Sequence, residues 1–332
     1  MTALSIAEED IPRLENKVAI ITGKHFRCRL DPISGIGLAA ARILMARGAH
    51  VHVLDLHPID EDFDTHFTPV PAAGNSPRKS SDQKLDEQGS ITFRECNVAD
   101  WKSLQQAFND IGHVDIAIAN AGVSQDTDYF ADTFDKDGQL EEPRYDVMNV
   151  NLRAALNFVK LSISAFRRQG PGGSIVLTAS ATAFAPEQSL SVYSALKLSV
   201  IGLVRALRPS IQHLCGATIN AVAPAATVSK LLPADLAGPI IAAGAPVSNA
   251  HHVGLAIVFS AVAHQLGQVE AYGRDSPDKV ASPGRWNGRV ILTLGDRWTE
   301  VEEPIARLRP QWLGEWNAEK TIFQQRLTDM RP

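Results

Sequence analysis

The chain has few cysteines, no excess of positive charge and no apolar run of membrane-spanning length. Its three cysteines, Cys28, Cys96 and Cys215, are scattered and show no CxxC spacing, which argues against a disulfide framework or a zinc site. The net charge of -5 gives no basic surface for nucleic acid or anionic lipid. The first residues, MTALSIAEEDIPRLENK, are polar and acidic, unlike a signal peptide. These observations predict a cytoplasmic protein with no nucleic-acid partner, no membrane span and no metal.

The remaining composition is typical of one large folded domain. Of the 332 residues, 45% are hydrophobic and 21% are charged, which is enough to bury a substantial core. Roughly seven apolar runs of strand length alternate with segments of helical periodicity, without an internal repeat. This order predicts an α/β fold: a single doubly wound parallel sheet (Rossmann fold) with helices on both faces.

We divide the chain into an N-terminal arm (1–13), a Rossmann domain (14–300) and a C-terminal tail (301–332). Within the domain, residues from about 58 to 88 are rich in Pro, Ser, Asp and Lys and have no hydrophobic period. This segment is predicted to be a polar surface insertion.

A serine, a tyrosine and a lysine between residues 173 and 197 are spaced for carbonyl and alcohol chemistry. Ser180 follows an apolar run, so we expect it just past the carboxyl end of a buried strand, where ligands bind in open α/β sheets. Tyr193 and Lys197 are four residues apart in a helical pattern and should share one helix face. A phenol is a poor base at neutral pH, and we expect the Lys197 ammonium to lower the pKa of Tyr193. A chance YxxxK on an amphipathic helix is the alternative.

Glycines lie between the first predicted strand and its helix, where a βαβ unit binds a pyrophosphate. The residues of this turn are Gly23, Ser34, Gly35, Ile36 and Gly37. Asp55 ends the second strand and is expected to bind the ribose hydroxyls of the adenosine. A solvated residue at a strand end is the alternative for Asp55. Because a carboxylate repels a ribose 2′-phosphate, NAD(H) is favoured, with NADP(H) still open.

Another predicted strand ends in Asn120, Ala121 and Gly122. These small residues allow close approach of a ligand, although an ordinary tight turn explains them equally well.

In their order along the chain, these motifs resemble the short-chain dehydrogenase/reductase family from residue 14 to about residue 295. The resemblance implies that Asn151, Ser180, Tyr193 and Lys197 are catalytic, and that Tyr193 and Lys197 also contact the cofactor. Its cofactor-binding positions include the turn residues above, Asp55, the adenine-side pair Asn97 and Val98, the triplet Asn120, Ala121 and Gly122, and Pro224, Thr227 and Val228 near the nicotinamide.

The resemblance implies an NAD(P)(H)-dependent oxidoreductase that interconverts a secondary alcohol and a ketone. It also implies a homodimer or homotetramer paired through the long helices near residues 145–168 and 192–207. The apolar segment 231–247 favours a hydrophobic small-molecule substrate. The tail sequence RPQWLGEWN resembles, more loosely, fungal members that act in secondary-metabolite biosynthesis.

The glycine turn departs from the family pattern by about eight extra residues, near 25–32. We expect them to bulge toward solvent, because folded inward they would block the pyrophosphate. Two alternatives therefore stay open. One is a catalytically impaired nucleotide-binding scaffold or sensor, and the other is a non-redox dehydratase or isomerase on the same fold.

Overall fold

The structure is a computed structural model that describes residues 2–23, 35–56, 89–229, 232 and 234–331. The predicted insertion at about 58–88, the extra residues near 25–32 and Ser34 lie outside the described residues.

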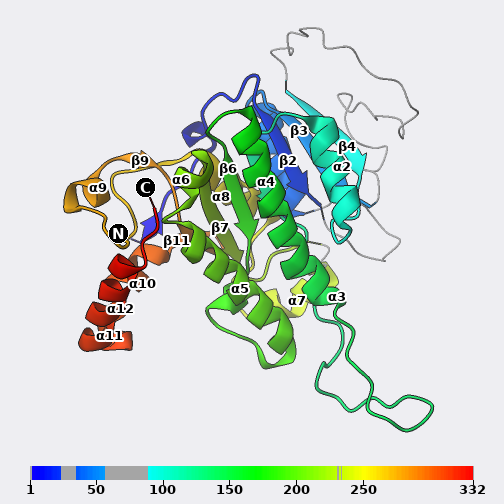
Figure 1. The fold of residues 1–332 in the computed structure, drawn as a ribbon. Helices are drawn as coiled ribbons and strands as arrows, with labels where there is room; N and C mark the ends of the chain where they lie inside the picture. Colours follow the sequence, from blue (N-terminus) through cyan, green and yellow to red (C-terminus); the bar gives the residue numbers. More distant parts are fainter. Residues whose placement is uncertain (1, 24–34, 57–88, 230–231, 233, 332) are drawn as a thin grey trace.

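A nine-stranded sheet forms the centre of the described chain, in the order β1-β11-β10-β7-β6-β5-β2-β3-β4 (Figure 1). The seven strands from β4 to β10 in this order are parallel, and β11 and β1 add antiparallel at the β10 edge. The predicted doubly wound parallel sheet is thus confirmed. The strands are β1 (Ala3–Leu4), β2 (Val18–Thr22), β3 (His50–Asp55), β4 (Ser90–Glu95), β5 (Ile116–Ala119), β6 (Ser174–Thr178), β7 (Thr218–Pro224), β10 (Val290–Leu294) and β11 (Arg297–Glu300).

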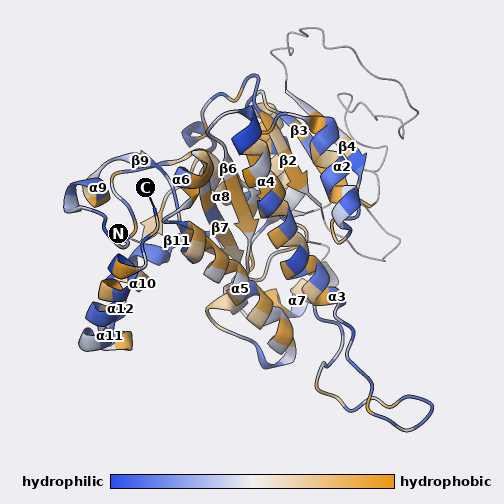
Figure 2. Cartoon of the chain, viewed as in Figure 1, coloured by the Kyte–Doolittle hydropathy of each residue, from blue (hydrophilic) through white to orange (hydrophobic). Residues whose placement is uncertain are grey.

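The central strands are buried on both faces. Every residue of β2, β5 and β7 is buried, and Figure 2 shows the middle of the sheet in hydrophobic colours. Because helices cover both faces of a parallel sheet, its strands are continuous apolar runs rather than alternating ones. This explains why short Val-, Ile- and Ala-rich runs predict these strands.

Helices cover the two faces in separate groups. Helices α1 (Ile36–Ala46) and α8 (Ala250–Val262) pack against each other and against one face. Helices α2 (Trp101–Ile111), α4 (Ala155–Gln169) and α5 (Ser191–Leu207), with the short α6 (Ile211–Cys215), cover the other (Figure 1). The sheet thus lies between two apolar cores.

The change of face occurs between β2 and β5. These strands are neighbours, yet α1 follows β2 on one face while α4 follows β5 on the other. Ligands bind in the crevice that such a switch point opens at the carboxyl ends of the strands. Thr22 and Asn120, at those two ends, therefore mark the expected site.

Between β5 and α4, the chain runs through a long exposed loop into α3 (Asp146–Met148) and η2 (Asn149–Ala154), one π-helical turn. The single long helix predicted here is therefore interrupted. π-helical turns inserted into α-helices occur often at functional sites.

One helical stretch, Gln188–Leu207, which includes α5, is long and apolar enough to cross a membrane by length and composition alone. In this fold it packs against β7 and η2, and its inward face belongs to the core. Its apolar character is accounted for by that packing and by an exposed stripe that includes Leu198.

The two ends of the chain lie near one edge of the sheet. β1 pairs with β11, and Ile6 and Ile11 are buried in the core beside α1 and α8. The tail forms α10 (Glu302–Arg307), α11 (Arg309–Leu313) and α12 (Glu315–Leu327), which extend away from the sheet (Figure 1). The remaining helices and strands are η1 (Glu8–Asp10), η3 (Ala181–Ala183), η4 (Gln188–Leu190), α7 (Ala234–Ala242), α9 (Pro277–Ala281), β8 (His264–Gln265) and β9 (Gly284–Arg285). The division into arm, domain and tail stays a prediction.

The core beneath α2 and α4 gives a test of this packing. Phe158 is buried and meets the Phe108 ring edge-on, with ring centroids 5.3 Å apart. Phe158→Ala removes a large side chain from a close-packed site, so we expect the free energy of unfolding to fall by about 3–5 kcal/mol in urea denaturation. Phe134→Ala, at a ring that is 60% exposed, should change it by less than about 0.5 kcal/mol. Equal effects of the two substitutions would contradict this packing.

Candidate active site

The ends of β2, β5 and β6 are tied together by side-chain hydroxyls. Thr22 Oγ1 accepts hydrogen bonds from the backbone N–H groups of Asn120 and Ala121, each at 3.0 Å. Thr178 Oγ1 donates to Asn120 Oδ1 at 3.2 Å. The predicted triplet after β5 is therefore held in a fixed position beside β2 and β6.

Glycines at the switch point permit close packing that a larger residue would prevent. A Cβ on Gly23 would collide with the Asp55 carboxylate, and one on Gly37 would lie 2.6 Å from Asn120 Nδ2. Gly35 has φ +94°, a left-handed conformation that favours glycine. Ile36 begins α1 directly after it. The α1 amino terminus that follows Gly35 could hold a pyrophosphate.

Asp55 lies inside this arrangement rather than at the surface. It is 2% exposed at the end of β3, and its Oδ1 accepts a hydrogen bond from Leu56 N at 2.7 Å. The alternative of a solvated residue is therefore wrong. Its carboxylate beside Gly23 fits recognition of ribose hydroxyls at the second strand end.

Asn97 and Val98 follow β4, next to Asp55 across the sheet. A backbone hydrogen bond joins the ends of β3 and β4, because Cys96 N donates to Asp55 O at 2.8 Å. Asn97 Oδ1 accepts from Ala99 N at 3.1 Å and Val98 is buried in the core. Asn97 thus shapes the turn.

Asn151 projects from the π-helical turn onto the loop after the triplet. Its side chain bonds both backbone groups of Val123, with Oδ1 accepting from N and Nδ2 donating to O, each at 2.8 Å. A Cβ on Gly122 would lie 3.2 Å from Asn151 Oδ1 and 3.4 Å from Lys197 Nζ. Asn151, Gly122 and Lys197 therefore meet.

Ser180 and Tyr193 are hydrogen-bonded to each other. Burial raises the pKa of Tyr193, the hydrogen bond from Ser180 opposes that increase, and Glu187 adds to it. Lys197 is not among the groups that shift the pKa, and its Nζ lies 5.6 Å from the Tyr193 ring centroid. The predicted lowering of the Tyr193 pKa by Lys197 is not found here, and Ser180 supplies the opposing interaction instead.

Lys197 is buried behind the tyrosine. It is 3% exposed, and Nζ donates to Thr178 O at 2.8 Å. Burial lowers the pKa of Lys197 from its ordinary value to about 8. The ammonium is therefore mostly charged at pH 7, but it loses its proton far more readily than a surface lysine.

Thr182 orients Ser180. Its hydroxyl donates to Ser180 Oγ at 3.0 Å, and its backbone N–H donates to the same atom at 3.2 Å. Since Ser180 Oγ accepts these two bonds, its own proton is directed elsewhere, to Tyr193 or to a substrate oxygen. A bond from Ser180 Oγ to Pro224 O, at 3.5 Å, is weak by comparison.

The amino terminus of α5 is held by a residue from the loop after β5. Gln125 Oε1 accepts from Val192 N and Tyr193 N at 3.0 and 3.1 Å, at a helix start that has no capping bond from its own N-cap side chain. This caps the helix that carries Tyr193 and fixes it relative to β5.

The segment after β7 completes the site. Thr227 Oγ1 donates to Ala225 O at 2.9 Å, and Val228 N donates to Ser248 O at 2.9 Å. Pro224 ends the strand beside Thr178 of β6, and Val228 exposes an apolar side chain. Pro224 thus ends β7, the neighbour of the strand that precedes Ser180, and Thr227 and Val228 follow it.

Sequence reasoning did not identify Gln125, Thr178 or Thr182 as part of the site. The close Ser180-x-Thr182 spacing is the one local signal, because a hydroxyl two residues on is well placed to bond back. Gln125 and Thr178 act through contacts with distant segments, which leave no local pattern.

Comparison with known proteins shows the family of this chain. Residues 70–236 match the family model for short chain dehydrogenases. The protein is 49% identical over its full length to short-chain dehydrogenase/reductase prx4 of Penicillium rubens, covering 90% of that protein. The chain belongs to the short-chain dehydrogenase/reductase family. ATR7 of Stachybotrys chlorohalonatus, a member with the same family name, is 42% identical over the full chain and 95% of its own length. The predicted likeness to fungal members is confirmed.

Solved structures of similar fold include two dehydrogenases with NADP. A proposed NAD(P)-dependent gluconate 5-dehydrogenase from Beutenbergia cavernae, with NADP at low occupancy, is 25% identical, with a TM-score of 0.54 over 75% of this chain and 90% of its own. A proposed 2-deoxy-D-gluconate 3-dehydrogenase from Agrobacterium tumefaciens, with bound NADP, is also 25% identical, with a TM-score of 0.55 over 74% of this chain and 89% of its own. This short-chain dehydrogenase/reductase is thus an oxidoreductase by family.

The role of Thr182 is open to a direct test. Thr182→Val removes one of the two bonds that orient Ser180, so we expect kcat to fall by about three- to tenfold, with cofactor affinity unchanged. Steady-state kinetics with a turned-over alcohol or ketone would measure this. Thr182→Ser keeps the hydroxyl and should retain most of kcat. A similar loss in both variants would show that Thr182 acts through packing instead.

Burial of Lys197 should also change stability with pH. Because its folded pKa is about 8, below the ordinary value of 10.5, the unfolded chain binds more protons between these two pH values and stability rises with pH there. Relative to Lys197→Met, the protein should gain about 2 kcal/mol of unfolding free energy between pH 7.5 and 9.5. Urea denaturation of both proteins at the two pH values measures this difference, and parallel pH profiles would contradict the burial of a charged amine.

Proposed function

We propose that this chain is an NAD(H)-dependent oxidoreductase that interconverts a secondary alcohol and a ketone on a hydrophobic small molecule. The observation that carries the proposal is the convergence of Ser180, Tyr193 and Lys197 at the carboxyl end of β6, beside the switch point. Asn151 holds the loop after β5 through its two hydrogen bonds with the backbone of Val123.

In ketone reduction, Tyr193 acts as the general acid. Its raised pKa keeps the phenol neutral at pH 7, which is the form that donates a proton to the carbonyl oxygen. Ser180, whose proton Thr182 directs outward, donates a hydrogen bond to the same oxygen as negative charge develops there. A nicotinamide cofactor held near Gly122 would supply the hydride for this direction.

In alcohol oxidation, Tyr193 must instead accept the hydroxyl proton. The hydrogen bond from Ser180 favours the phenolate form of Tyr193. Because burial raises the pKa of Tyr193 and opposes the phenolate, the rate of oxidation should increase with pH.

Several described residues fit a dinucleotide. Gly23, Gly35 and Gly37 would receive the pyrophosphate, and Asp55 the adenosine ribose. The two solved neighbours carry NADP, but we give more weight to the buried Asp55 carboxylate, which disfavours a 2′-phosphate, and therefore propose NAD(H). Ser34 stays a predicted contact.

Two further parts of the proposal rest on surface residues and on relatives. Exposed Val228 and Ile241 near the β7 side of the site support a hydrophobic substrate, and the fungal relatives support a role in secondary-metabolite biosynthesis. Leu156 of α4 and Leu198 of α5, 43% and 49% exposed, support a homodimer or homotetramer formed through these helices.

The experiment is turnover of a panel of secondary alcohols and ketones, followed by NADH absorbance, with wild type and Tyr193→Phe. We expect Tyr193→Phe to lower turnover by about a hundredfold or more, because it removes the proton-transfer group, and to leave NADH affinity nearly unchanged. Titration with NADH and NADPH, followed by fluorescence, measures both affinities. Tighter binding of NADPH would refute the assignment of Asp55.

Other results would favour the alternatives. Cofactor binding without turnover across the panel favours a scaffold or sensor. Product formation without a change in NADH absorbance favours non-redox chemistry. Undiminished turnover by Tyr193→Phe would disprove the proposed acid and base.

A further inference from the structure

A polar cavity lies away from the candidate active site. It has a volume of about 590 Å³ and is enclosed by the end of α5, α6, the segment from Gln265 to Asn287, and the tail helices α10 and α11. Lys197 precedes Arg205, the first charged residue of α5 in the cavity wall, by eight positions, or about 12 Å of helix. None of the candidate catalytic residues lines it.

The wall of this cavity carries more positive than negative side chains. Among the described lining residues, six are Lys or Arg and three are Asp or Glu, in a protein whose overall net charge is -5. The excess is therefore local.

Three arginines share two glutamates on one side of the cavity. Glu302 binds Arg205 through two hydrogen bonds of 2.8 Å and lies 3.4 Å from Arg208. Glu270 pairs with Arg208 and, at 2.5 Å, with Arg309. Burial lowers the pKa of Arg208, and the nearby Arg205 and Arg309 lower it further, against the opposing effect of the two glutamates. One positive charge remains uncompensated in this group.

Arg285, on β9, carries a second uncompensated positive charge. Its Nη2 donates to Gly173 O at 2.8 Å and to Ser174 Oγ at 2.6 Å, and both are neutral acceptors. No carboxylate of the described chain pairs with it, and burial alone lowers its pKa. Its Nε and Nη1 have no hydrogen-bond partner among the described residues, so they can serve a ligand in the cavity.

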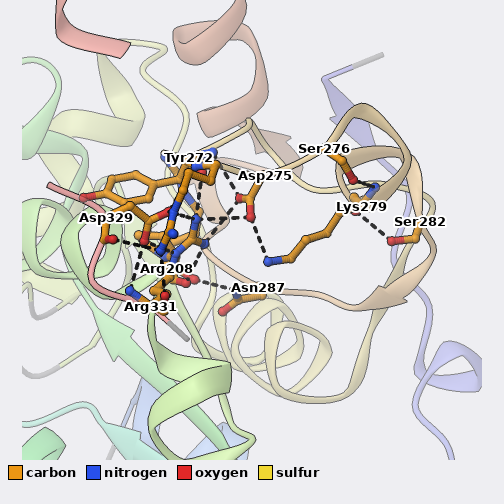
Figure 3. Close-up of polar contacts among 11 residues, drawn as sticks. Arg208, Tyr272, Asp275, Ser276, Lys279, Ser282, Asn287, Asp329 and Arg331 are labelled. Atoms are coloured by element: carbon orange, nitrogen blue, oxygen red, sulfur yellow. Dashed lines mark hydrogen bonds and ion pairs between the residues drawn. The ribbon is translucent and has the colours of Figure 1, made fainter. Parts of the chain in front are cut away.

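The remaining charges balance one another. Figure 3 shows Arg331 between Asp275 and Asp329, and Lys279 reaching Asp275. Asp329 does not line the cavity, but it binds Arg331. Its carboxylate balances the positive charge that is left over here when only the lining residues are counted. This part of the wall is closed by the chain's own ion pairs, and the unbalanced charge belongs to Arg285 and to the group of Arg205, Arg208 and Arg309.

We propose that this cavity binds a small organic anion, with one carboxylate or phosphate group between Arg285 and the arginine group and an apolar body against the tail. Partly buried guanidinium groups without counter-charges attract anions, and an anion from solution can pair with them through charge-assisted hydrogen bonds. The volume is within the range of small-molecule sites. Val269, Ile305 and Trp312 provide the apolar part of the wall.

Calorimetric titration of the purified protein at low ionic strength tests the proposal. The probes are phenyl phosphate, phenylacetate, inorganic phosphate and the neutral phenylacetamide. We expect saturable binding of the two aromatic anions, weaker binding of inorganic phosphate and none of phenylacetamide. Arg285→Gln should weaken binding of phenyl phosphate by about tenfold or more, because one charge-assisted contact is lost.

Matched variants locate the effect. Arg309→Gln should also weaken binding, and Arg285→Lys should retain part of it. Arg297→Gln removes the same charge from an exposed residue of β11 and should leave binding unchanged. If Arg285→Gln does not fold, Arg309→Gln decides. Turnover of wild type and Arg285→Gln should be equal, so this site and the proposed function fail independently.

Several results would overturn the proposal. They are no saturable binding of either aromatic anion, an equal loss in Arg297→Gln, or undiminished binding in both cavity variants. Equal affinities for phenyl phosphate and inorganic phosphate would disprove the apolar part of the site.

Discussion

The two hydrogen bonds that Thr22 accepts from Asn120 and Ala121 are the contact on which the site depends. They join β2 to β5 at the switch point. The helix that follows β2 and the helix that follows β5 lie on opposite faces of the sheet. Gly37 against Asn120 and Gly23 against Asp55 belong to this same close approach. A larger residue at either position would push apart groups that the sheet register holds together.

Much of this could be predicted from the sequence because it depends on local spacing. The step from Tyr193 to Lys197 is one helical turn, and Ser180 directly follows a buried strand, so their meeting needs only the standard geometry of a parallel sheet. The parts that could not be predicted act at long range. Gln125 caps α5 from 67 residues away, and Thr178 binds Lys197 through its carbonyl oxygen, which carries no sequence signal. The interrupting π-helical turn at Asn151 also has no composition that distinguishes it from an ordinary helix.

The same burial has opposite consequences for the two ionisable groups of the site. It disfavours a charged Lys197 and a charged Tyr193, so it lowers the pKa of the lysine and raises that of the tyrosine. Hydrogen bonds change this balance locally. Thr178 O accepts from the ammonium, and Ser180 donates to the phenol. The reactivity of Tyr193 is therefore controlled mainly by the orientation of one hydroxyl, and through it by Thr182.

Helix α5 connects two polar regions of different character. Near its start, one buried lysine is supported by neutral hydrogen-bond acceptors and lies beside a phenol. At its end, Arg205 and Arg208 share carboxylates from α10 and from the segment after β8. The carbonyl groups that end a helix carry partial negative charge, which favours cations there and makes an arginine group at this end less costly than at the other. Arg309 and Arg285 reach the same place from the tail and from β9, so the charge excess arises only when three distant segments fold together. Neither the net charge nor any local motif of the sequence could indicate it.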